Sequence, residues 1–277
     1  GNEMRFEVVP GKTTRGGTMD RKGSTCIHCG APIDFDYIRQ ETKSSRMGAK
    51  LMAVVAEGKK GRLYIAPDEA QMFSANVQRP KDHPDGLIAT NPRDIRSHHY
   101  GMDYFSDLFT NRQLTALTTF SELVGEAQKK AEADAIAAGL PDDGVGLADG
   151  GTGARAYGEA VGVYLAFAVD KCSNLWSAIT GWMNDRGAFR ETFARQAIPM
   201  VWDYAEANPF SNSGGSFLQC LSRIPDTLTF LPLHIANGTA RQFDAQSDNG
   251  MRGILVSTDP PYYDNIGYAD LSDFFYV

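Results

Sequence analysis

The sequence has few of the features that mark membrane or secreted proteins. No apolar run reaches the roughly 18 residues that a membrane-spanning helix needs, and the first residues lack the charged-then-apolar pattern of a secretory leader. Only four of the 277 residues are cysteine, and two of them share one Cys-x-x-Cys, so a secreted disulfide framework is not indicated. We therefore expect a cytoplasmic protein with one large core, or with one domain and a small appendage.

The chain is acidic overall, but its charge is unevenly distributed. The formal net charge of −7 is unfavourable for a protein that binds a polyanion such as nucleic acid. Lysine and arginine nevertheless outnumber aspartate and glutamate in residues 1–62, whereas acids dominate residues 63–277. Any phosphate contacts are therefore expected near the N-terminal part or on a local patch. A solvated basic face explains the same pattern equally well.

The N-terminal part contains a motif typical of a zinc knuckle. Cys26 and Cys29 are separated by two residues and followed by Gly30, which permits the tight turn that points both thiolates at one metal ion. A four-coordinate zinc site needs two more ligands. The remaining cysteines, Cys172 and Cys220, lie in apolar, helix-like surroundings, where free cysteine is usually a small core residue. A redox Cys-x-x-Cys would normally open a helix after a strand, so we predict a metal half-site.

Hydrophobic spacing and capping signals predict the main elements of the chain. Helices are predicted at residues 68–77, 110–138, 155–184, 187–196 and 217–223, and from residue 270 onward. A hairpin is predicted within residues 49–66, and strands are predicted at 228–236 and 253–257. The Gly/Asp-rich residues 140–154 do not follow a predicted strand, as a phosphate cradle would, so we interpret them as a surface loop.

One short segment near the C-terminal end carries the clearest chemistry. Asp259-Pro260-Pro261-Tyr262 follows the apolar run 253–257, which places the acid at the carboxyl end of a predicted strand, where α/β enzymes bind ligands. Asp259 and the carbonyl of Pro260 can each accept one N–H of a planar exocyclic amine, and Tyr262 can stack on a base that has left the duplex. Two acceptors favour the tetrahedral nitrogen that attacks a methyl group. The same residues could also form an ordinary turn.

This tetrapeptide resembles the catalytic motif of S-adenosylmethionine-dependent amino-methyltransferases that modify adenine N6 or cytosine N4. The run 257–277, together with residues 202–210 and 105–120, is similar to the large adenine-specific DNA methylases that carry a zinc ribbon. The resemblance implies N6 methylation of adenine in double-stranded DNA, with S-adenosylmethionine as the methyl donor. Cytosine N4, RNA and a glutamine side-chain amide are alternative substrates. A non-catalytic module that binds nucleic acid or a partner is the alternative from another class.

The resemblance also assigns roles to individual residues. The catalytic residues would be Asp259, Pro260, Pro261 and Tyr262, and the residues that line the pocket or hold its loop would be Tyr263, Asp264 and Asn265. Weaker candidates for cofactor contacts are Asn212, Gly214 and Gly215, because they precede a predicted helix whose N-terminus presents free N–H groups.

The implied fold is α/β and has three parts. A basic, zinc-ribbon-like β segment at 1–67 precedes a mainly helical region at 68–200, and a partial Rossmann-like methyltransferase sheet occupies 201–277. In the resembling family, the glycine-rich turn for S-adenosylmethionine lies upstream of the ribbon, and a Cys-x-x-Cys such as Cys26–Cys29 forms the second half of that ribbon. The resemblance therefore implies an internal fragment with weak or no activity of its own.

Overall fold

The computed structural model of the protein describes residues 6–9, 11, 16–231, 241–244, 246–260, 263 and 265–276. Its α-helices are α1 (Phe35–Lys43), α2 (Glu69–Ser74), α3 (Asn111–Ala137), α4 (Ala154–Ser173), α5 (Phe217–Thr229) and α6 (Tyr268–Tyr276). Its strands are β1 (Ser24–Thr25), β2 (Pro32–Ile33), β3 (Val54–Gly58), β4 (Gly61–Ile65), β5 (Gly181–Met183) and β6 (Ala188–Arg190). Short 3-10 helices lie at η1 (Ser97–Tyr100), η2 (Phe105–Leu108) and η3 (Leu147–Asp149).

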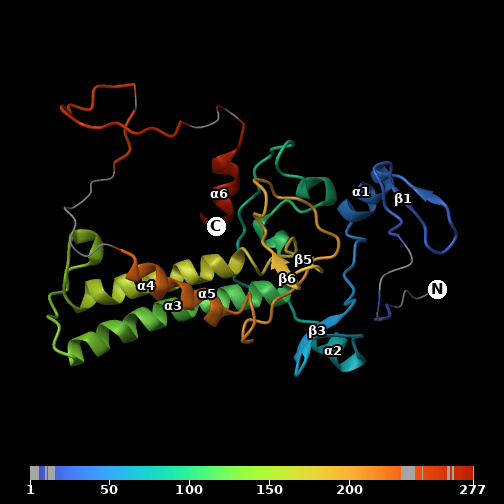
Figure 1. The fold of residues 1–277 in the computed structure, drawn as a ribbon, viewed down its shortest axis with the longest axis horizontal. Helices are drawn as coiled ribbons and strands as arrows, with labels where there is room; N and C mark the ends of the chain where they lie inside the picture. The colour runs from blue at the N-terminus through green and yellow to red at the C-terminus, as the bar shows by residue number, and fades with distance from the viewer. Residues whose placement is uncertain are drawn as a thin grey trace.

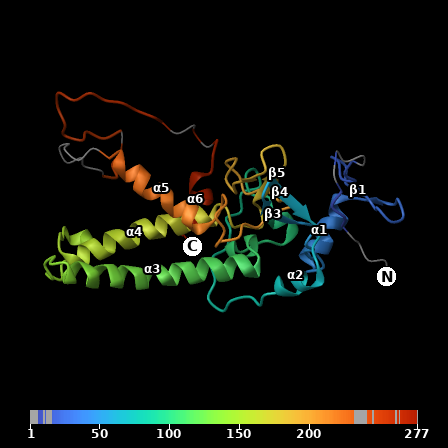
Figure 2. The same ribbon diagram turned by 60° about the horizontal axis from the view of Figure 1, so that its bottom comes forward.

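The long helices α3 and α4 lie side by side and form the largest element of the structure (Figures 1 and 2). The predicted capping box at the start of α3 is confirmed: the Thr110 hydroxyl accepts from the Gln113 N–H, and the Gln113 amide oxygen accepts from the Thr110 N–H. Glycines let the two helices approach closely. A Cβ added at Gly158 or Gly162 of α4 would lie 2.9 Å or 2.8 Å from atoms of Gln128 in α3. The helix α5 packs against α4.

Two hydrophobic clusters form the core. The first joins loop residues before α3 to residues near β5 and to α6: Ile88, Ile95, Phe105, Leu108, Ile179, Ile198, Leu271 and Phe274. The second lies where α3, α4 and α5 meet, and consists of Cys172, Leu175, Trp176 and Cys220 with partly buried aromatic neighbours. The prediction that Cys172 and Cys220 are core residues is confirmed. The two residues belong to the same buried cluster, a proximity that the sequence did not indicate.

The described strands form three separate two-stranded antiparallel sheets, β1–β2, β3–β4 and β5–β6. The predicted hairpin is confirmed, since β3 pairs with β4 from Val54 opposite Ile65 to Gly58 opposite Gly61. None of these three sheets is the predicted Rossmann-like sheet. That sheet stays a prediction, because part of residues 201–277 lies outside the described ranges. Among the described residues, no helix is both long and apolar enough to cross a membrane.

Two predicted helices were wrong or too long. The helix predicted at 155–184 ends at Ser173, because Ser177 and Thr180 form a buried hydroxyl cluster with Thr192 that turns the chain. The apolar residues that suggested further helical turns pack in the core clusters instead, Leu175 and Trp176 in the second and Ile179 in the first. The helix predicted at 187–196 is wrong: β6 begins directly after Gly187, whose N–H donates to the carbonyl of Met183 to close a hairpin.

Two predicted strands also differ from the structure. Residues 253–257 are irregular and exposed, with Leu255 98% accessible to solvent. An apolar run forms a buried strand only when a neighbour pairs with it, and none of the described strands does so. The strand predicted at 228–236 is wrong at its start, because α5 continues through Pro225 to Thr229. Its residues 232–236 lie outside the described ranges.

Candidate functional site

The described half of the Asp-Pro-Pro-Tyr motif, Asp259 and Pro260, lies outside the helical body. Figure 1 shows the chain from residue 246 to 260 running away from the helices before it returns at α6. Asp259 and Pro260 are exposed in this irregular stretch. Tyr263 is 94% exposed with a φ of 52°, and Asn265 is also exposed. The described members of the motif therefore face solvent and do not converge on a pocket. Pro261, Tyr262 and Asp264 lie outside the described residues.

The C-terminal side of this segment is fixed to the core by α6. Ile266 packs against the first core cluster, and Leu271 and Phe274 of α6 are buried in it. The Asn91 side-chain amide donates a hydrogen bond of 3.0 Å to a carboxylate oxygen of Asp270. The chain that follows the motif is therefore packed against residues 88–109.

The zinc knuckle has the predicted backbone geometry. The Cys26 N–H donates to the Ala31 carbonyl, the Gly30 N–H donates to the Cys26 carbonyl, and Gly30 has a φ of 73°. Hydrogen bonds from the backbone N–H groups of Cys29 and His28, and then from the Cys29 thiol, lower the pKa of Cys26. A lowered pKa favours the thiolate that binds a metal.

The knuckle supplies only part of a metal site. The described residues contain no cluster of three or more His, Cys, Asp or Glu side chains that could hold a metal ion. A zinc half-site formed by Cys26 and Cys29 therefore stays a prediction.

The weaker cofactor candidates, Asn212, Gly214 and Gly215, lie just before α5. Gly215 is buried with a φ of 88°, and its carbonyl accepts a 2.6 Å hydrogen bond from the Trp176 indole. A Cβ at Gly215 would lie 3.0 Å from Ala207 and 3.1 Å from Phe189, so close packing accounts for this glycine. Gly214 and Asn212 are exposed. A contribution of these residues to cofactor binding therefore stays a prediction.

A cleft that the sequence did not indicate lies beside the start of α3. It has a volume of about 150 Å³. Its apolar lining residues are Ala116, Trp176, Ala207 and Pro209, and its polar ones are Arg112, Gln113 and Glu206. We call this the α3 cleft. The Trp176 indole donates to the Gly215 carbonyl, and Ala207 lies close to Gly215. Gly215 therefore packs against two of the residues that line the cleft.

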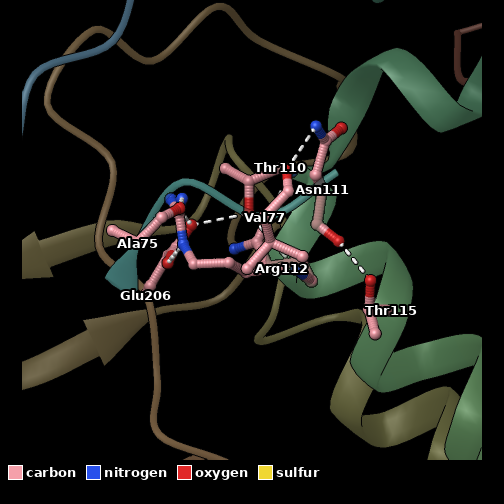
Figure 3. Close-up of polar contacts among 8 residues, drawn as sticks. Ala75, Val77, Thr110, Asn111, Arg112, Thr115 and Glu206 are labelled. Atoms are coloured by element: carbon pink, nitrogen blue, oxygen red, sulfur yellow. Dashed lines mark hydrogen bonds and ion pairs between the residues drawn. The ribbon is translucent and has the colours of Figure 1, made fainter. Parts of the chain in front are cut away.

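Two residues that line the α3 cleft, Arg112 and Glu206, belong to a polar network (Figure 3). Arg112 forms a two-point ion pair with Glu206, with Nε–Oε2 and Nη2–Oε1 distances of 2.8 Å and 2.7 Å. The Thr110 hydroxyl donates to Glu206 Oε1 over 2.6 Å, and Arg112 also donates to the Ala75 carbonyl. The hydrogen bonds that Arg112 donates to Glu206 raise the pKa of Arg112, against the opposing effect of burial. The ion pair therefore joins α3 to the segment 202–210.

Sequence reasoning found both halves of this network without joining them. Thr110 and Gln113 were recognised as a capping box, and residues 202–210 as a stretch that resembles the methylases. No local pattern could reveal that Arg112 and Glu206 meet, because they are 94 positions apart in the chain. No protein-family model, curated protein or solved structure matches the chain. The function is therefore argued from these sites alone.

Proposed function

We propose that this chain is part of an S-adenosylmethionine-dependent methyltransferase that modifies the N6 amine of adenine in double-stranded DNA. The observation that carries the proposal is the order of residues in Asp259-Pro260-Pro261-Tyr262: an acid, two prolines that stiffen the backbone, and an aromatic ring. This order suits a planar amine, which needs two acceptors and a stacking surface.

In the proposed mechanism, this chain binds and orients the amine. Asp259 accepts one amino hydrogen and the Pro260 carbonyl accepts the other, while Tyr262 stacks on the extruded base. The lone pair of an aromatic amine is delocalised into the ring, so the free amine is a weak nucleophile. Two acceptors favour the tetrahedral nitrogen and therefore stabilise the transition state more than the ground state. The prolines fix their φ angles and keep both acceptors aimed before the base arrives.

Two structural features support this role. Asp259 and Pro260 are exposed, as groups that meet a base from solvent must be. The chain that follows the segment is packed on the core through Ile266 and α6, which anchors the C-terminal side of the segment. A cytosine N4 amine presents the same two hydrogens and is the nearest alternative substrate.

A binding module without catalysis is the second candidate. Its support is the excess of basic residues in 1–62 together with the zinc-knuckle geometry of Cys26 and Cys29. In this alternative, the N-terminal part contacts DNA phosphates and Asp259 has no role in binding the amine.

Base extrusion provides the test. A duplex with 2-aminopurine in place of one mismatched adenine emits more strongly when that base leaves the stack. We expect emission to rise when the protein is added, and to fall back with Asp259→Ala and with excess adenine-containing duplex. The exposed Asp185→Ala is the matched control and should behave as the wild type. Absence of any rise contradicts the proposal. DNA binding with a rise that Asp259→Ala leaves unchanged favours the binding module.

A further inference from the structure

Cationic side chains gather where α1 packs against η1. Arg39 and Lys43 are four residues apart in α1 and therefore lie on the same face of that helix. The C-terminal end of α1 meets η1 closely, because a Cβ added at Gly101, which ends η1, would lie 3.2 Å from the Cα of Lys43. Two further basic residues come from η1 and the residue before it. The four residues, which we call the α1–η1 cluster, are Arg39, Lys43, Arg96 and His99.

His99 lies within the electrostatic field of the other three members of the cluster. Partial burial of its ring lowers the pKa of His99 most, and the positive charges of Arg39, Lys43 and Arg96 lower it further. The neighbouring His98 acts in the same direction. Because one imidazole is affected by cations from both α1 and η1, an anion placed beside it would be attracted by all of them.

Two of these cations are available to a ligand. Lys43 and Arg96 are exposed, and neither forms an ion pair with a described residue. Arg39 donates one hydrogen bond of 3.2 Å to the exposed Asp36. The histidine before His99 is bonded to the carboxylate of Asp103 over 2.8 Å. The cluster therefore presents unpaired positive charge at the surface.

Exposed cations favour a polyanion over a single small anion. In water, one pair of exposed opposite charges usually contributes no more than about 1 kcal/mol. A nucleic-acid backbone gains more, because each phosphate that a protein neutralises releases condensed counterions. The α1 members of the cluster also lie within residues 1–62, where basic residues outnumber acidic ones. The phosphodiester backbone is therefore the anion that suits this surface best.

We propose that the α1–η1 cluster binds the phosphodiester backbone of DNA. Lys43 and Arg96 each neutralise a phosphate, and a ring nitrogen of His99 donates a hydrogen bond to a phosphate oxygen. Such contacts hold the duplex on the protein without reading its sequence. The proposal rests on the DNA substrate proposed above, but it does not depend on the chemistry of Asp259.

The salt dependence of DNA binding counts the phosphate contacts. The logarithm of the binding constant falls with the logarithm of the salt concentration, with a slope of about 0.9 per phosphate neutralised. Lys43→Ala and Arg96→Ala should each weaken binding of a duplex made of G·C pairs, measured by fluorescence anisotropy, and reduce this slope by about 1. Because that duplex contains no adenine, a failure of adenine extrusion would leave this test intact.

Two control variants separate local contacts from net charge and from misfolding. Lys130→Ala removes the same charge from an exposed position of α3 and should leave the slope unchanged. Lys43→Arg keeps the charge in the cluster and should retain the wild-type slope. Wild-type slopes in both Lys43→Ala and Arg96→Ala would overturn the proposal, as would the absence of duplex binding by the folded wild-type protein.

The ring of His99 reports the bound anion directly. A phosphate beside the ring favours its charged form, so an NMR titration should give a higher pKa for His99 with saturating duplex than without it. The resonance is assigned with His99→Gln. Inorganic phosphate at the same ionic strength should give no comparable rise. A pKa that the duplex leaves unchanged would overturn the proposal, and a rise with inorganic phosphate alone would identify a free phosphate instead and also overturn it.

Discussion

Replacing Phe274 by alanine should release α6 and the motif segment next to it. Phe274 is 6% exposed, and its ring lies 5.6 Å from that of Phe109 and 5.0 Å from that of Phe193. Truncating a buried phenylalanine usually costs about 3–5 kcal/mol. The loss of stability in Phe274→Ala cannot exceed the free energy with which α6 packs on the core. If the packing of α6 is weakened by more than that, α6 detaches while the rest of the protein stays folded. We therefore expect about 3 kcal/mol, at the low end of that range.

Hydrogen exchange and urea unfolding together measure this loss. Phe274→Ala should accelerate amide exchange of residues 268–276, with a smaller change in α3 and α4. The control is Tyr276→Ala, at a position that is 90% exposed, where the stability should change by no more than about 0.5 kcal/mol. Equal exchange and equal stability in the two variants would refute the anchoring of the motif segment by α6.

Three further predictions concern other parts of the structure. Gly215→Ala should destabilise the protein by about 1–3 kcal/mol in urea unfolding, because φ is 88° and a Cβ would press on neighbouring atoms; the open Gly214→Ala is the control, and equal effects would contradict the packing role. Burial opposes protonation of His98, but hydrogen bonds from its ring to a carboxylate and to a carbonyl outweigh this and raise its pKa. The charged form therefore stabilises the fold below the unfolded pKa of about 6.5, and this stabilisation is lost as the pH rises through the folded pKa. His98→Ala should cost more stability at pH 6 than at pH 8, and an NMR titration that gives a pKa below 6.5 would contradict this. Cobalt added as a zinc substitute should give a thiolate-to-metal absorption band that Cys26→Ser and Cys29→Ser each reduce; an unchanged band would contradict the half-site.

Local patterns predicted the elements that are held by local interactions. The capping box at Thr110, the β3–β4 hairpin and the turn at Gly30 each depend on residues within a few positions of one another. The end of α4 was missed because the turn is held by hydroxyl contacts between Ser177 and Thr192, which periodicity does not report. The apolar run 253–257 has strand composition, but strand formation requires a partner that composition cannot supply.

The candidate sites also differ in whether their residues are neighbours in the sequence. The Asp259 motif and the Cys26–Cys29 knuckle are contiguous in sequence, so their chemistry can be inferred from residue order alone. The α3 cleft is lined by Gln113 and by Arg112 and Glu206, which form an ion pair across 94 positions of the chain. These features arise only after α3, α4 and the 202–216 stretch have packed together.

The central claim is that Asp259 and the Pro260 carbonyl accept the two amine hydrogens of adenine. A mismatched duplex in which the extruded adenine carries a ¹⁵N-labelled amine allows these hydrogens to be observed directly by NMR. The account predicts that adding the wild-type protein shifts both amino proton resonances downfield and slows rotation of the amine, and that Asp259→Ala restores one of the two resonances toward its free position. Identical spectra with the wild-type protein and with Asp259→Ala, under conditions where both bind the duplex, would contradict it.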